Sequence, residues 1–261
     1  EHACKVDEPR HLFREVSSSF YKGKPNLAKE IKIPWFVGIE LEAVNGDAEI
    51  LNAKLDRKVG MDHDGSLQGR APKEMQLPPS SNEKLEQVIR HTTRIARNAG
   101  YKVNKTCGMH IHLDATTNSM MNDHNLVFRL LSTYYAIEPV IFAMLPKSRR
   151  NNKYALPLKS WIGEAKMLQM TRRPVPTINE LREIWYKTRD AGNINVFRNN
   201  KWDTSRYHGF NLHALFTRGT IEMRYFNGTL NRDKIINWIN FHLTIFVWVR
   251  DHFDQNVIDA I

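Results

Sequence analysis

Three short stretches of the chain alternate apolar residues with charged or metal-ligating ones. They are Gly38-Ile39-Glu40-Leu41-Glu42, Gly108-Met109-His110-Ile111-His112 and Thr220-Ile221-Glu222-Met223-Arg224. Because successive side chains of a β-strand point to opposite faces, each stretch separates its apolar residues from its polar ones. A shorter stretch, Glu74-Met75-Gln76-Leu77, follows the same pattern. If the four strands share a sheet, one face packs on helices and the other collects Glu40, Glu42, Glu74, His110, His112, Glu222 and Arg224.

Alternation alone is weak evidence for a functional site, because any antiparallel sheet with one solvated face shows it. Here the polar positions are filled by Glu and His, which are metal-ligand types, and not by Lys, Ser or Thr. Two carboxylates about 4 Å apart repel each other by roughly 4 kcal/mol at an effective dielectric constant of 20. A face that holds three or more carboxylates in a cleft therefore indicates bound cations, and divalent metals are the natural ones.

The order of the predicted elements favours an α+β domain with a curved, mainly antiparallel sheet and helices on one face. Strands that alternate are atypical of a doubly wound parallel sheet, whose strands are continuously apolar. A capping box, Ser80-Ser81-Asn82-Glu83, predicts the start of a helix that ends at Gly100. We expect strands at 35–44, 71–77, 101–114 and, as a pair, 208–226, and further helices at 122–144, 177–190 and 231–252. Residues 1–34 are interpreted as an N-terminal extension and residues 35–261 as one catalytic domain.

Charge and composition limit the possible partners. The formal charge of +10 indicates an anionic partner, and two Cys cannot build a disulfide framework. The longest apolar run, Ile235 to Val249, is too short and too polar to cross a bilayer. No signal-peptide pattern is visible at residue 1, and we expect a cytoplasmic protein without membrane contact.

Much of the positive charge lies between Lys147 and Arg232. The run Ser148-Arg149-Arg150-Asn151-Asn152-Lys153-Tyr154 belongs to a long region without a clear structural pattern. Long basic loops around a rigid sheet often carry substrate contacts, but a solvated run of charge fits the same pattern. The residues alone are compatible with both interpretations, a substrate-binding loop and a solvated run of charge.

The motifs, taken in order, resemble the amidoligase family. G-I-E-L-E, an acidic turn, E-M-Q-L-P-P, T-C-G-M-H-I-H-L-D, S-R-R-N-N-K-Y and R-x4-N followed by G-T-I-E-M-R-Y-F-N-G-T occur in the family's order. That family belongs to the carboxylate–amine ligase superfamily, with glutamine synthetase and glutamate–cysteine ligase. The resemblance covers roughly residues 35 to 250. It implies a glutamine-synthetase-like catalytic domain.

The resemblance also implies a reaction. Such ligases transfer the γ-phosphate of ATP to a carboxylate, and an amine then displaces phosphate from the acyl phosphate, with Mg²⁺ or Mn²⁺ bound at the site. The partners would be ATP, a carboxylate and an amine, with a peptide or another anionic molecule among the candidates. Two alternatives remain: a metal-dependent hydrolase that uses the same Glu and His face, and a basic nucleic-acid-binding module, for which no motif occurs.

Residue roles follow from the matched motifs. The resemblance implies metal ligands at Glu40, Glu42, Glu74, His110 and Glu222, with Asp64 of the acidic turn as a looser match. It implies nucleotide or phosphate contacts for His112, Asn211, Arg149, Arg150 and Lys153. It assigns the reacting groups to Arg224, Arg206 and Glu222.

Overall fold

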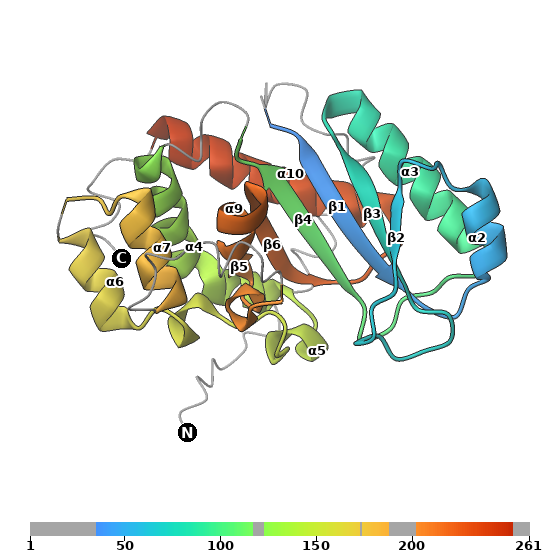
Figure 1. Cartoon of the computed structure of the whole chain (residues 1–261), viewed down its shortest axis with the longest axis horizontal. Coiled ribbons are helices and arrows are strands. Elements are labelled where there is room, and N and C mark those ends of the chain that lie inside the picture. The colour runs from blue at the N-terminus through green and yellow to red at the C-terminus, as the bar shows by residue number, and fades with distance from the viewer. Residues whose placement is uncertain (1–34, 117–122, 173, 188–201, 253–261) are drawn as a thin grey trace, which may run out of the picture.

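The computed structural model describes residues 35–116, 123–172, 174–187 and 202–252 (Figure 1). The predicted extension, residues 1–34, lies outside the described residues. Within them the strands form one open antiparallel sheet in the order β2-β3-β1-β4-β6-β5. The prediction of an α+β fold with an antiparallel sheet is therefore confirmed. The strands are β1 (Val37–Ala43), β2 (Gly60–Asp62), β3 (Lys73–Ser80), β4 (Gly108–Asp114), β5 (Phe210–Asn211) and β6 (Thr220–Asn227).

Three long helices cover the apolar face of the sheet: α3 (Asn82–Asn98), α4 (His124–Met144) and α10 (Arg232–His252) (Figure 1). Leu41, Ile111 and Met223 point into this layer and are fully buried. Ring contacts tie the layers together: Tyr134, Phe246 and Trp238 on the helices pack on Phe210, Trp35 and Phe226. Shorter helices are α2 (Ala48–Lys54), α5 (Lys147–Arg150), α6 (Glu164–Thr171), α7 (Ile178–Tyr186) and α9 (His213–Arg218).

Helix α4 is long and apolar enough to cross a membrane, and most of its apolar stretch is buried inside the protein. The longest apolar run of the sequence, residues 235–249, was considered above as a possible membrane span. It lies in α10 instead. In both helices most apolar residues are buried, as expected for a central helical layer, whereas Val140 of α4 and Trp248 of α10 are exposed.

Two local predictions were wrong. The capping box at Ser80 does not form: Ser81 precedes the helix without a side-chain bond, and Ser80 is still paired with Val37 in β3. The Ser80 hydroxyl donates to the carbonyl of Pro78, 3.0 Å away, within a bulge of β3 at the two prolines. A bulge is one of the few strand positions that accept proline, and the strand therefore continues past them.

The predicted strand pair at 208–226 contains a helix. Only Phe210 and Asn211 pair with β6 on this side, and helix α9 follows at once. The side-chain oxygen of Asn211 accepts a hydrogen bond of 2.8 Å from the amide of His213, and Gly219 ends the helix in the left-handed conformation. These two local signals outweigh the apparent alternation.

Glu138 of α4 is a buried carboxyl between the helical layer and the sheet. It accepts hydrogen bonds from the amide of Leu158, at 2.6 Å, and from the hydroxyl of Tyr225, at 2.9 Å. Burial raises the pKa of Glu138 to about 8, although both hydrogen bonds act in the opposite direction. Glu138 therefore links α4, the loop around residue 158 and β6 through one group that prefers to be protonated.

This shift predicts a pH dependence of stability. Between about pH 5 and 8 the folded protein holds a proton that the unfolded chain has lost, and the free energy of unfolding therefore falls as pH rises. Glu138→Gln keeps the size and one accepting oxygen for the amide of Leu158, its NH2 group can donate to the Tyr225 hydroxyl, and it cannot ionise. We expect the difference between wild type and Glu138→Gln in urea unfolding to change with pH, by at most about 1.4 kcal/mol per unit. Glu83→Gln, an exposed control on α3, should lack this trend, and parallel curves for wild type and Glu138→Gln would contradict the assignment.

Candidate active site

The register of the sheet brings the predicted polar side chains together on one face. On β1, Glu40 lies opposite His110 of β4, and Glu42 lies opposite Glu74 of β3. On the other side of β4, His112 lies opposite Glu222 of β6. Because directly opposed residues share a face of the sheet, the chosen register converts separate motifs into one cluster.

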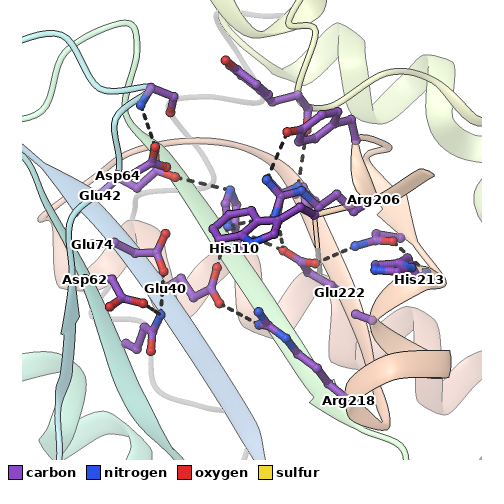
Figure 2. A pocket seen from close by; sticks show the side chains of 18 of the residues that line it. Glu40, Glu42, Asp62, Asp64, Glu74, His110, Arg206, His213, Arg218 and Glu222 are labelled. Atoms are coloured by element: carbon purple, nitrogen blue, oxygen red, sulfur yellow. Dashed lines mark hydrogen bonds and ion pairs between the residues drawn. The ribbon is translucent and has the colours of Figure 1, made fainter. Parts of the chain in front are cut away.

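This cluster, apart from the buried His112, forms the floor of a cleft of about 280 Å³ (Figure 2). One wall is formed by Asp62 at the end of β2, by His63 and Asp64 in the loop that follows, and by Glu74 of β3. The opposite wall comes from residues 202–218, which include α9. Among the predicted site residues, those that line the cleft are Glu40, Glu42, Asp64, Glu74, His110, Arg149, Arg206, Asn211, Glu222 and Arg224.

Glu40, His112 and Glu222 form the first candidate metal-ligand cluster, with one possible ligand atom from each lying within 4.8 Å of the others. The Nδ1 atom of His112 lies 3.0 Å from the hydroxyl of Thr220, and within the described part of the chain its buried Nε2 atom has no hydrogen-bond partner. Nε2 instead lies 3.3 Å from Glu40 and 3.6 Å from Glu222. The Thr220 hydroxyl thus fixes Nδ1 and leaves Nε2 facing two carboxylates. This arrangement is typical of a metal-binding histidine.

Glu42, Asp64 and Glu74 form the second candidate cluster, also within 4.8 Å. Asp64 is held by the amide of Ser66, which donates to its carboxylate over 2.7 Å. Glu42 accepts a hydrogen bond from the amide of Gly108. An all-carboxylate set offers the hard oxygen ligands that Mg²⁺ and Mn²⁺ prefer, and the donor types therefore fit a divalent cation.

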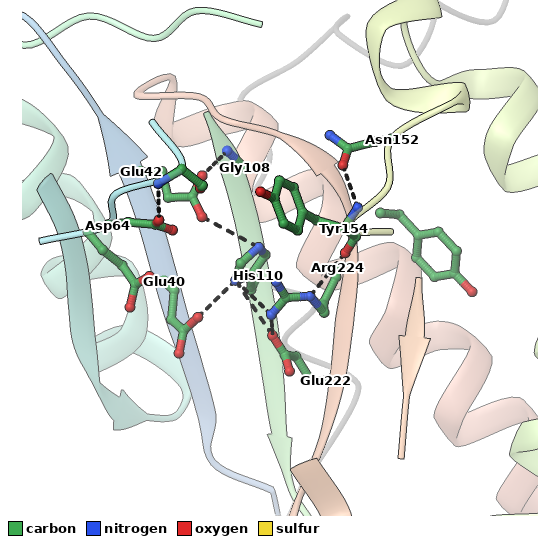
Figure 3. A network of polar contacts seen from close by, with 12 residues as sticks. Glu40, Glu42, Asp64, Gly108, His110, Asn152, Tyr154, Glu222 and Arg224 are labelled. Carbon is green, nitrogen blue, oxygen red and sulfur yellow. Dashed lines mark hydrogen bonds and ion pairs between the residues drawn. The ribbon is translucent and has the colours of Figure 1, made fainter. Parts of the chain in front are cut away.

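His110 lies between the two clusters (Figure 3). Its Nδ1 atom is 2.8 Å from Glu40, and its Nε2 atom is 3.7 Å from Glu42. Nδ1 is also 3.5 Å from Glu222. The sequence analysis gave the metal role to His110 and a nucleotide role to His112, whereas among the described residues it is His112 that belongs to a three-ligand cluster.

The pKa values of the carboxyls differ across the floor. Burial raises the pKa of Glu40, but His112 and His110 outweigh it and hold it well below its usual range. Burial also raises the pKa of Glu222, but the charges of Arg224 and then His112 outweigh it and hold this pKa at about 2. For Glu74, burial and then the charge of Glu40 both raise the pKa. His112, His110 and Arg224 thus favour the ionised forms of Glu40 and Glu222, whereas burial and a like charge disfavour the ionised form of Glu74.

Arg224 is placed by a bulge in β6. Met109 pairs with Phe226 and Ile111 with Met223, so that Arg224 and Tyr225 together oppose one residue of β4. A bulge redirects a side chain and leaves backbone groups without ladder partners. Here the Arg224 guanidinium donates to Glu222 over 2.5 Å and reaches the carbonyl of Tyr154 at 3.3 Å.

Arg149 satisfies the carbonyls at this bulge. Its guanidinium donates to the carbonyl oxygens of Arg224, at 2.9 Å, and Tyr225, at 3.2 Å. The side chain is buried, and burial lowers the pKa of Arg149 to about 10 despite the nearby charge of Glu42. Arg149 lines the cleft, but its hydrogen bonds serve the backbone that carries Arg224.

The other predicted nucleotide contacts lie differently. Asn211 donates to Glu222 over 2.6 Å and so orients that carboxylate. Arg150 donates to the carbonyls of Leu145 and Ala143 at the end of α4, and neither Arg150 nor Lys153 lines the cleft. The ammonium group of Lys153 lies 4.9 Å from the centre of the Tyr154 ring.

Several residues in or beside the cleft were not expected from the sequence. Thr220 begins the β6 motif and was treated as its flank, yet it contacts His112. Arg218, Trp202 and Tyr154 line the cleft from segments without a clear pattern in the sequence. The position of Thr220 two residues before Glu222, hence on the same face, was the one signal that could have identified it.

Residues 44–246 match the model of the protein family described as "Putative amidoligase enzyme". The match covers most of the chain and includes β3, β4 and β6, but it begins just after Glu40 and Glu42. This finding confirms the family expected from the order of the motifs. A comparison with curated proteins found no match.

The contact between Thr220 and His112 predicts a loss of metal affinity in Thr220→Val. Valine keeps the shape of threonine but removes the hydroxyl that orients His112, and we expect Mn²⁺ affinity at that cluster to fall about tenfold. Electron paramagnetic resonance of unbound Mn²⁺ measures this directly. Thr217→Val is the matched control, because the Thr217 hydroxyl lines the same cleft but bonds to the carbonyl of His213. An unchanged Mn²⁺ titration in Thr220→Val would argue against His112 as a ligand.

Proposed function

Since the chain belongs to the amidoligase family and is thus an enzyme of the ligase type, we propose that it joins a carboxylate to an amine with consumption of ATP. In the proposed reaction the carboxylate oxygen attacks the γ-phosphorus of ATP, and the bond to the β-phosphate oxygen breaks to release ADP. The amine nitrogen then attacks the acyl carbon, phosphate leaves with the bonding electrons, and the nitrogen loses a proton. The products are an amide, ADP and phosphate.

The convergence of both carboxylate clusters on the floor of one cleft carries this proposal. Glu40, His112 and Glu222 would hold one divalent cation, and Glu42, Asp64 and Glu74 a second. Bound Mg²⁺ or Mn²⁺ would neutralise the triphosphate and the charge that develops during phosphoryl transfer. Without such cations, an acidic floor would repel both ATP and the carboxylate substrate.

Arg224 is the protein group best placed to stabilise the transferred phosphoryl group. Its guanidinium lies on the floor beside Glu222 and His110, and its side chain is only 12% exposed. Burial lowers the pKa of Arg224, but the charges of Glu222 and Glu40 together outweigh burial, and the pKa is raised overall. A fixed, desolvated cation costs no reorganisation when charge builds up on the phosphoryl oxygens. Asn211 and Arg149 act through other groups, because they hold Glu222 and the bulge that carries Arg224.

Hydroxylamine tests the reaction without knowledge of the natural amine, because it intercepts acyl phosphates and gives coloured hydroxamates with iron(III). The purified protein with ATP, Mg²⁺ and a panel of carboxylic acids and acidic peptides should release ADP and form hydroxamate with at least one acid. Hydrolytic cleavage of one of the acidic peptides in the absence of ATP would instead favour the metal-dependent hydrolase.

Loss of the cluster should abolish this activity. Glu40→Gln removes a charged ligand with little change in size, and we expect ADP release to fall by about 100-fold or more. Glu49→Gln, an exposed residue of α2, is the matched control and should leave activity unchanged. Chelation with EDTA should stop turnover and added Mg²⁺ should restore it, and a chelator-resistant reaction would contradict the proposal.

A further inference from the structure

The two walls of the cleft carry opposite charge. Asp62, Asp64 and Glu74 line the side of β2 and β3, whereas Arg206 and Arg218 line the side formed by residues 202–218 (Figure 2). The first wall is suited to cations, and the second is suited to an anion. The proposed reaction needs an anionic substrate besides ATP, namely the carboxylate, and the cationic wall is therefore its natural binding surface.

Arg218 is the most exposed of the arginines that line the cleft in the described part of the chain. It is the last residue of α9, its side chain is 49% exposed, and Gly219 ends the helix directly after it. Among the described residues, the structure gives its guanidinium one contact, a long one of 3.4 Å to Glu40. An arginine with one weak contact keeps most of its donors available to a ligand.

Arg218 differs in this respect from the two arginines deeper in the cleft. The donors of Arg149 are bound to backbone carbonyls, and Arg224 is bound to Glu222 and to the Tyr154 carbonyl. Their side chains are buried or nearly so. Arg224 thus belongs to the reaction centre, whereas Arg218 reaches the part of a substrate that lies toward the opening.

The contact with Glu40 makes this availability depend on the first cluster. Glu40 is one of the three groups that would hold a cation with His112 and Glu222. A divalent ion there would take over the charge of Glu40 and repel the guanidinium, which has exposed space to turn into. With the metal in place, the cationic wall would then present the guanidinium of Arg218 to a ligand in the cleft.

We propose that Arg218 binds a non-reacting acidic group of the carboxylate substrate, and hence that this substrate carries at least two acidic groups. This inference rests on the proposed function, because it assigns one of the two substrates of that reaction to the wall formed by residues 202–218. A planar guanidinium binds a carboxylate through two parallel hydrogen bonds, which makes it selective as well as attractive. Arg206 supports the same wall, because its guanidinium lies 4.7 Å from the Trp202 ring and 4.8 Å from the Tyr207 ring.

Succinate and succinamate form a matched pair of probes, since they differ in one carboxylate. Calorimetric titration of the protein loaded with Mg²⁺ and ADP should show succinate binding at least about tenfold more tightly than succinamate. Arg218→Gln should remove this preference, and Arg218→Lys should restore part of it through charge without the fork. Arg94→Gln, an exposed arginine of α3 outside the cleft, is the control for net charge and should keep the preference.

The titration of Mg²⁺ and ADP in the same variants separates this inference from the proposed function. Unchanged nucleotide affinity together with a lost preference for succinate supports the assignment. A weaker nucleotide affinity in Arg218→Gln would make Arg218 a phosphate ligand and overturn it. Equal affinity of the wild type for both probes, including no binding of either, would also overturn it while hydroxamate formation still upheld the ligase.

Discussion

The site depends on the register of β1 between its two neighbours. This register places Glu40 opposite His110, an attractive pair, but it also places Glu42 opposite Glu74, two carboxylates within 4.8 Å that repel by several kcal/mol. The first cluster is stabilised by His112, His110 and Arg224, which keep Glu40 and Glu222 ionised. In the second cluster, neighbouring groups offset burial and like charge less completely, and the pKa of Glu74 is raised. The sheet tolerates this strain because its other face is buried throughout, and a slip by one residue would expose that face.

The same argument explains how much could be predicted from the sequence. Alternation with period two fixes which residues share a face, and burial of Leu41, Ile111 and Met223 then excludes registers shifted by an odd number of residues. Helix α9 could not be predicted this way. Its start depends on the hydrogen bond that the side-chain oxygen of Asn211 accepts from the amide of His213, and its end depends on the left-handed conformation of Gly219. Arg218 and Trp202 enter the cleft through contacts between segments far apart in the sequence, for which local patterns carry no signal.

Arg149 illustrates a limit of assigning roles by motif. Its place in a basic run favours an anionic ligand, yet its hydrogen bonds are spent on the carbonyls that the β6 bulge leaves without partners. On the opposite side of the same bulge, the hydroxyl of Tyr225 donates to Glu138, which also holds the amide of Leu158. The orientation of Arg224 is therefore fixed from both sides of the sheet, by one buried cation and one buried acid. The geometry of the candidate site thus depends on groups that need not touch a substrate.

A basic protein with an acidic sheet face is at first sight contradictory. The structure resolves this, because the cations of the region from residue 147 to 232 are partly turned inward: Arg149 and Arg150 bond to backbone carbonyls, and Arg224 to Glu222. Arginines that are consumed in this way cannot form the exposed stripe that binding to a phosphate backbone requires, because each contact there needs an accessible charge. A cleft in which acids face arginines favours a small substrate that carries both metal-binding and guanidinium-binding groups. A nucleotide with its cations, beside an acid with a second carboxylate, meets both conditions.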